Sequence, residues 1–155
     1  MGTPPDRTVV RPAGERDLEL LVGFNRALAR ETEGLDLDPD RLRAGVRAVL
    51  GDAARGSYLV AEAAGRAVGA LLVTREWSDW RAGWFWWIQS VYVEPEHRRR
   101  GVYGELHREV AARARRAGDV RGLRLYVDRA NAGARATYLA LGMAPSHYDL
   151  FETEG

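Results

Sequence analysis

One stretch of the chain has the residue types of a phosphate-binding turn. Residues 89–104 read Gln-Ser-Val-Tyr-Val-Glu-Pro-Glu-His-Arg-Arg-Arg-Gly-Val-Tyr-Gly, an apolar strand pattern, a proline break and a helical pattern. The first amides of a helix lack partners within it and carry partial positive charge. Gly101 would let the backbone approach a ligand, beside arginines with fork geometry. The stretch therefore indicates a pyrophosphate cradle, although a solvated arginine run before an ordinary helix has the same letters.

The elements that would position this turn are those of a mixed α/β fold. Hydrophobic spacing predicts the order β-α-α-β-β-β-α-β-α-β, with helices on both faces of a mixed sheet. Residues 31–37 and 76–83 break the pattern and are expected to be loops. Helices are expected at about 15–30, 39–50, 102–117 and 131–141, and strands at 9–12, 58–63, 67–74, 84–93, 123–127 and 146–151.

With these elements in place, the chain resembles the GNAT superfamily of acetyl-CoA-dependent N-acetyltransferases. The family pattern is Arg or Gln-x-x-Gly-x-Gly or Ala opening a helix, and Arg98, Gly101 and Tyr103 occupy its three places. A second block at 123–143 is similar to the family's fifth strand, the Asn at the next helix start and the Tyr-x-x-x-Gly-Phe ending, with Met in place of Phe. The resemblance implies a GNAT-like fold and transfer of an acetyl group to an amine.

The resemblance also implies roles for individual positions. Main-chain groups of Val91, Tyr92 and Val93 would bind the pantetheine arm of acetyl-CoA between splayed fourth and fifth strands. Asn131 would contact the pantetheine region or the acyl site, and Tyr138 would lie near the thioester sulfur as a general acid. The pyrophosphate site would comprise Arg98, Arg99, Arg100, Gly101, Val102, Tyr103 and Gly104, chiefly through their backbone amides.

Two positions depart from the family pattern. Tyr103 replaces a small residue, so its ring must point away from the phosphates. Family members often carry a general-base Glu on the fourth or fifth strand, where this chain has Gln89, Ser90 and Tyr126. The general base is therefore unassigned. Tyr138 also has a structural alternative, a core aromatic residue on the last helix.

The acceptor pocket is sought in the two irregular segments. Glu31 and Glu33 lie between the first two helices, where this fold usually builds the acceptor wall, and they are candidates for acceptor binding or for the base. Carboxylates beside indoles, as in residues 76–80, would suit a cationic amine. Solvated loop charges are the alternative for both segments.

Composition narrows the remaining possibilities. The chain has no cysteine, which excludes a covalent acyl-Cys intermediate, and its three histidines lack metal-ligand spacing, so we expect direct transfer without a metal. The net charge of +1 argues against a nucleic-acid partner. No stretch approaches the ~20 apolar residues of a membrane span, so a cytoplasmic location is expected.

Length and partners complete the expectations. At 155 residues, the chain suits one domain over 1–155. The acceptor is expected to be a small-molecule amine or a peptide N-terminus, and a homodimer remains open. A non-catalytic acyl-CoA-binding sensor or scaffold of the same fold is the alternative function, motivated by the missing strand carboxylate.

Overall fold

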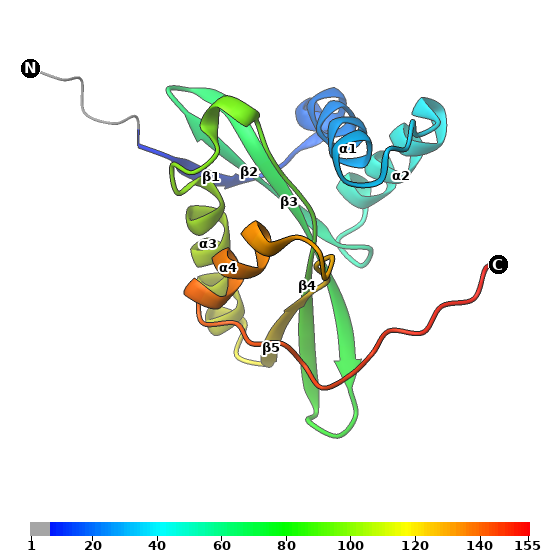
Figure 1. Cartoon of the computed structure of the whole chain (residues 1–155), viewed down its shortest axis with the longest axis vertical. Helices are drawn as coiled ribbons and strands as arrows, with labels where there is room; N and C mark the ends of the chain where they lie inside the picture. Colours follow the sequence, from blue (N-terminus) through cyan, green and yellow to red (C-terminus); the bar gives the residue numbers. More distant parts are fainter. Residues whose placement is uncertain (1–6) are drawn as a thin grey trace, which may run out of the picture.

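The computed structural model describes residues 7–155, so residues 1–6 of the expected single domain lie outside the described part (Figure 1). The elements are β1 Val9–Pro12, the 3-10 turn η1 Glu15–Asp17, α1 Leu18–Glu33, α2 Pro39–Gly51, β2 Ser57–Ala63, β3 Arg66–Ser78, β4 Gly83–Val93, the 3-10 turn η2 Pro95–His97, α3 Val102–Ala117, β5 Val120–Leu125 and α4 Ala132–Ala140. This order confirms the mixed α/β fold. None of the described helices is both long enough and apolar enough to cross a membrane.

The five strands form one sheet in the order β1-β2-β3-β4-β5. The first four strands are antiparallel to their neighbours, and β5 runs parallel to β4. Successive side chains of a strand point to opposite faces. In β2, Val60 packs with Leu21 and Val46 of α1 and α2, whereas Leu59 packs with Leu106 of α3. The sheet therefore has α1 and α2 on one face and α3 on the other.

Local signals set several helix ends as expected. The Asp38 side chain accepts hydrogen bonds from the amides of Asp40 and Arg41 at 2.9 Å, which caps α2 just before Pro39. Gly34 ends α1 in the left-handed conformation, with φ 62°. Helix α3 is bounded by Gly101 before its first turn and Gly118 after its last turn, both in the left-handed conformation.

Two expected loops are partly regular structure. Helix α1 extends to Glu33, so Glu31 and Glu33 lie in its last turn rather than in a loop. Strand β3 continues to Ser78, so the expected loop at 76–83 shrinks to a turn at 79–82 between β3 and β4. The indole rings of Trp77 and Trp84 are 5.0 Å apart, edge to face, and this cross-strand pair explains the extension.

The expected last strand at 146–151 is not formed. No helix or strand is present after α4, and residues 144–155 are exposed. A strand requires a neighbouring strand for its backbone hydrogen bonds, and none of the described strands pairs with this segment. Residues 146–151 have the residue pattern of a strand, but no described strand of this chain pairs with them.

Candidate functional site

The site begins where β4 separates from β5. The parallel pairing ends at Ile88 and Leu125, and beyond Ile88 strand β4 is paired only with β3. At the same place β4 bulges, because Leu71 of β3 faces both Ser90 and Val91, and Ser90 has φ 50°. A bulge bends its strand and increases the local twist. The β5 side of Val91–Val93 is therefore free of a strand partner in the described chain, as a splayed pair requires.

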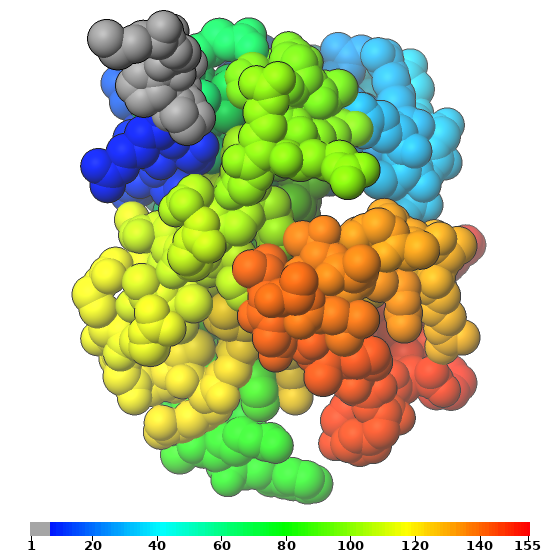
Figure 2. All heavy atoms as spheres, turned by 60° about the vertical axis from the view of Figure 1, so that its left-hand side comes forward, coloured from blue at the N-terminus to red at the C-terminus, as the bar shows by residue number. Residues whose placement is uncertain are grey.

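The turn that follows β4 presents unpaired amides at the start of α3. Gly101 is the N-cap residue with φ 80°, and Arg99 also has a positive φ of 60°. The Glu105 amide donates to the Gly101 carbonyl at 3.0 Å, so the amides of residues 102–104, which precede this bond, have no partner within the helix. Figure 2 shows the segment leading into α3, in light green, above the orange α4, with a hollow between them.

Open space surrounds the backbone of this turn. A Cβ atom built on Gly101 would meet no other heavy atom within 4 Å, and the side chains of Arg99 and Arg100 are exposed. Amides at a helix start, together with free guanidinium groups, can hold an anion. These features are compatible with the pyrophosphate cradle that the sequence predicts, which stays a prediction.

Arg98 is positioned differently from its two neighbours. Its Nη2 donates to Glu31 Oε2 of α1 at 2.7 Å, and its Nε donates to the Val93 carbonyl at 2.8 Å. Its guanidinium also lies over the ring of Tyr92, 5.5 Å from the centroid. Arg98 therefore ties the turn to β4 and α1 in this structure. Glu31, expected as an acceptor or base residue, is in an ion pair here.

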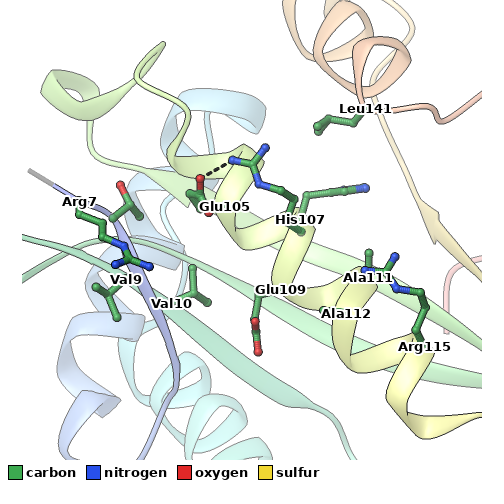
Figure 3. A pocket seen from close by; sticks show the side chains of 12 residues that line it. Arg7, Val9, Val10, Glu105, His107, Glu109, Ala111, Ala112, Arg115 and Leu141 are labelled. Atoms are coloured by element: carbon green, nitrogen blue, oxygen red, sulfur yellow. Dashed lines mark hydrogen bonds and ion pairs between the residues drawn. The ribbon is translucent and has the colours of Figure 1, made fainter. Parts of the chain in front are cut away.

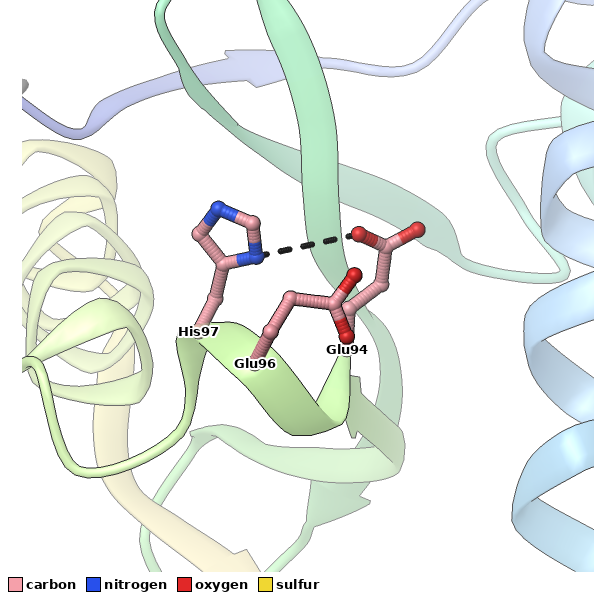
Figure 4. Close-up of side chains that lie close together, drawn as sticks. All are labelled: Glu94, Glu96 and His97. Carbon is pink, nitrogen blue, oxygen red and sulfur yellow. Dashed lines mark ion pairs between the residues drawn. The ribbon is translucent and has the colours of Figure 1, made fainter.

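A second ion-pair network holds the turn from the opposite side. Glu94, Glu96 and His97 place one ligand atom each within 4.8 Å of one another (Figure 4). Arg66 Nη2 lies 2.7 Å from Glu94 and 3.7 Å from Glu96, while His97 Nδ1 lies 3.7 Å from Glu94. The Arg66 guanidinium already pairs with both carboxylates, which weakens their attraction for a further cation. The cluster instead fixes η2 against β3.

Two tyrosines link the start of α3 to α4. The rings of Tyr103 and Tyr138 are 5.5 Å apart, edge to face, and the Tyr103 hydroxyl lies 3.3 Å from Nδ1 of His107. Burial raises the pKa of both phenols above the ordinary value of 10. The Tyr103 ring thus packs between α3 and α4.

Asn131 is used as a helix cap in this structure. Its Oδ1 accepts a hydrogen bond from the Ala134 amide at 3.0 Å and begins α4. Gly142, with φ 87°, follows the other end of α4, as expected. None of the residues of α4 is buried, so Tyr138 provides the aromatic contact that holds α4 to α3.

The sheet face below α1 brings together residues that sequence reasoning did not connect. The rings of Trp87 and Tyr126 lie 4.6 Å apart, and Arg124 of β5 lies 3.5 Å from the centroid of Phe85. Arg124 Nη1 also donates to Glu76 Oε1 at 2.7 Å. The face is therefore aromatic, and the carboxylate of Glu76 beside it is in an ion pair. No local pattern could have identified this face, because its members come from three strands.

The position where relatives often carry a base is occupied by an amide. Gln89 Nε2 donates to the hydroxyl of Thr74 on β3 at 2.5 Å. Neither side chain is a carboxylate, so the base is not found at this strand position. Glu33 is exposed in the last turn of α1 and makes no ion pair within the described residues.

One cavity in the described part of the chain lies away from these groups. It has a volume of about 670 Å³ and lies beside α3 on the flank of β1 (Figure 3). Its lining includes Val10, Leu141 and the ion-paired Glu105 and Arg108, and it contains none of the residues expected to bind the cofactor. Open strand edges and helix-start amides, rather than an enclosed cavity, mark the site.

Comparison with solved structures finds close matches to this fold. A possible acetyltransferase from Clostridium difficile 630 is 41% identical with a TM-score of 0.89, covering 96% of this chain and 97% of that one. A predicted acetyltransferase from Clostridium acetobutylicum, solved with acetyl-CoA, is 16% identical with a TM-score of 0.77 over 95% and 96% of the two chains. An aminoglycoside N-acetyltransferase in complex with CoA is 19% identical with a TM-score of 0.76 over 99% of each.

No curated protein matches the chain, whereas a family model does. The family model described as "Acetyltransferase (GNAT) family" matches residues 22–143, which run from within α1 to just beyond α4 and contain the whole proposed cofactor turn. The chain therefore belongs to the GNAT acetyltransferase family and is a transferase.

Proposed function

We propose that this chain transfers an acetyl group from acetyl-CoA directly to an amine. The observation that carries the proposal is the junction of two features: the gap between β4 and β5 after Ile88, and the helix-start amides beside Gly101. The gap has room along one strand edge for an amide-containing arm, and the turn has the donors for a pyrophosphate. The two solved neighbours that hold acetyl-CoA or CoA support the choice of cofactor.

The proposed transfer requires that one proton leaves the acceptor amine and that one proton reaches the CoA sulfur. The acceptor amine must lose a proton, to a carboxylate or a chain of waters, before its nitrogen attacks the thioester carbon. The new C–N bond forms as the C–S bond breaks, and the CoA sulfur takes the electron pair. Tyr138 has no hydrogen-bond partner for its hydroxyl in the described structure, so its proton is available to that sulfur. No step requires a covalent enzyme intermediate.

The acceptor is proposed to approach from the face that carries α1 and α2. On this face, Trp87 and Tyr126 form an aromatic floor beside the end of the β4–β5 pairing, and Glu33 is an exposed carboxylate at the end of α1. Aromatic faces and a carboxylate attract a cation. The proposed acceptor class is accordingly a cationic small-molecule amine or a peptide N-terminus, acting in the cytoplasm.

The experiment that tests the function uses the full chain and acetyl-CoA. We expect acetyl-CoA to raise the melting temperature, because a ligand that binds only the native state stabilises it. A panel of amines, including a polyamine, an aminoglycoside and a peptide with a free N-terminus, is then assayed for release of CoA thiol. Release above the rate of hydrolysis with at least one amine is expected. Stabilisation without release from any amine would instead indicate a non-catalytic acyl-CoA-binding protein.

The two α1 carboxylates are expected to act on different substrates. Glu31→Gln should raise the Kd for acetyl-CoA by about 2- to 5-fold, because it removes an exposed ion pair that holds Arg98 and the turn. Glu33→Gln should leave this Kd unchanged and raise the KM of a cationic acceptor by a similar factor. Titration calorimetry and steady-state kinetics measure the two constants, and each variant serves as the control for the other. A change in acceptor KM alone on Glu31→Gln would place this carboxylate in the acceptor pocket.

A further inference from the structure

Arg124 of β5 lies on the sheet face that is proposed to receive the acceptor. Its neighbours in the strand, Leu123 and Leu125, pack against the core beneath α3, so Arg124 points to the opposite face. There it pairs in register with Trp87 of β4, whose ring packs against that of Tyr126. A guanidinium group therefore lies beside the aromatic floor, close to the end of the β4–β5 pairing.

Two contacts fix the guanidinium of Arg124 and leave one of its edges available. The group lies 3.5 Å from the centroid of the Phe85 ring, and its Nη1 donates to Glu76 Oε1 at 2.7 Å. Nε and Nη2, which form one edge of the fork, have no hydrogen-bond partner within residues 7–155, and neither atom is buried from solvent. A fork edge of this kind can donate two parallel hydrogen bonds to one carboxylate.

The charges around the Phe85 ring favour an anion. Arg81, in the turn between β3 and β4, places a second guanidinium over this ring, 5.2 Å from its centroid. Among the described residues, Arg81 forms no ion pair, and Arg124 pairs only with Glu76. Two cations therefore share the ring with one paired carboxylate, and a further negative charge is attracted there.

We propose that the acceptor carries a carboxylate in addition to the amine that is acetylated, and that Arg124 binds this carboxylate through Nε and Nη2. The proposal rests on the proposed acetyl transfer and narrows its acceptor class to amino acids and related amino carboxylates. Arg124 is then a specificity-determining residue, with Trp87 and Tyr126 lying against the carbon chain of the acceptor. Amines without an anionic group are poor acceptors, because no charge of theirs pairs with the two guanidinium groups over Phe85.

Matched acceptors that differ by one carboxylate test the proposal. The pairs are lysine and cadaverine, ornithine and putrescine, and phenylalanine and phenethylamine, each assayed with the full chain and acetyl-CoA for release of CoA thiol. The best acid is expected to have a kcat/KM about 10-fold or more above that of its decarboxylated partner, as for loss of a hydrogen-bonded charge. Equal or faster acetylation of the decarboxylated amines would overturn the proposal, although acetyl transfer itself would stand.

Arg124→Gln removes the fork, and Arg75→Gln is its matched control. Arg75 adjoins Glu76 in β3 and so points to the opposite face, where its guanidinium lies 5.5 Å from the centroid of Trp84. Arg124→Gln should raise the KM of the best acid by about 10-fold or more and leave that of its decarboxylated partner unchanged. Arg75→Gln should change neither constant. An unchanged KM for the acid in Arg124→Gln, or an equal rise for both acceptors, would refute the role of Arg124.

Calorimetric titration separates failure of this proposal from failure of acetyl transfer. If no probe releases thiol, the proposed function fails, and the same acids are titrated into the full chain in the presence of CoA. Binding of an acid that Arg124→Gln weakens by about 10-fold or more would support the carboxylate site independently of turnover. Absence of binding by every acid, or binding that the substitution leaves unchanged, would overturn it.

Discussion

Gly101→Val is expected to lower the affinity for acetyl-CoA by about 100- to 1,000-fold. Gly101 has φ 80°, a region that a β-branched residue essentially cannot adopt, so the turn must change its conformation. The change would redirect the amides at the start of α3. Hydrogen bonds to a charged group contribute about 1.5–3 kcal/mol each, so losing two of them near the lower end of this range, about 3–4 kcal/mol, gives a factor of this size. Titration calorimetry with acetyl-CoA measures the loss.

Gly118 provides a control on the same helix. It follows the other end of α3 with φ 81°, and a Cβ atom built there would also meet no heavy atom within 4 Å. Gly118→Val should therefore destabilise the fold by a similar amount, yet leave the affinity for acetyl-CoA unchanged. Melting temperatures of both variants, measured without ligand, check the first expectation. Wild-type affinity in Gly101→Val, or an equal loss in Gly118→Val, would contradict the assignment of the pyrophosphate site.

Tyr138→Phe is expected to lower kcat by up to about 100-fold while leaving the affinity for acetyl-CoA nearly unchanged. The substitution keeps the ring that packs against Tyr103 and removes only the hydroxyl. Burial raises the pKa of Tyr138 above 10, so the phenol keeps its proton throughout the neutral range and can donate it to a thiolate. The CoA thiol is itself moderately acidic, which limits the effect to that of a single general acid.

Tyr103→Phe is the matched control for this variant. It removes a hydroxyl from the same aromatic pair, but that hydroxyl lies 3.3 Å from Nδ1 of His107, on the side of α3. Tyr103→Phe should therefore leave kcat close to the wild-type value. Presteady-state measurements under conditions where chemistry limits turnover give the relevant rate. An unchanged rate in Tyr138→Phe would remove the proton-donor role, and a parallel loss of stability and activity would indicate a core aromatic residue.

The ion pair between Glu31 and Arg98 connects the two proposed substrate sites. It links the last turn of α1, beside the proposed acceptor face, to the turn proposed to hold the pyrophosphate. Arg98 uses Nη2 for Glu31 and Nε for the Val93 carbonyl, so in the described structure Nη1 is left to donate to a phosphate while Glu31 holds the guanidinium in place. The Glu31→Gln and Glu33→Gln pair of variants is informative for this reason, because it separates the cofactor side of α1 from the acceptor side.

Local patterns were sufficient for the order of the elements from β1 to α4, and they marked the turn that is proposed to bind the cofactor. Asp38 with Pro39 marks a helix start, and Gly101 marks a left-handed residue before α3, because these preferences arise from each residue's own backbone and its near neighbours. The proposed cofactor turn at 98–104 is contiguous in the sequence, so its residue types alone indicated an anion site. Asn131 and Gly142 bounded α4 for the same reason.

Only the tertiary structure decided the contacts between distant segments. Glu31 and Arg98 are 67 positions apart, so no local pattern could pair them. The bulge at Ser90 arises from the register of β4 against β3 and gives no sequence signal, since a serine at positive φ is uncommon. Residues 146–151 have the pattern of a strand in the sequence, but a strand forms only where a neighbouring strand accepts its hydrogen bonds. No described strand of this chain pairs with the segment.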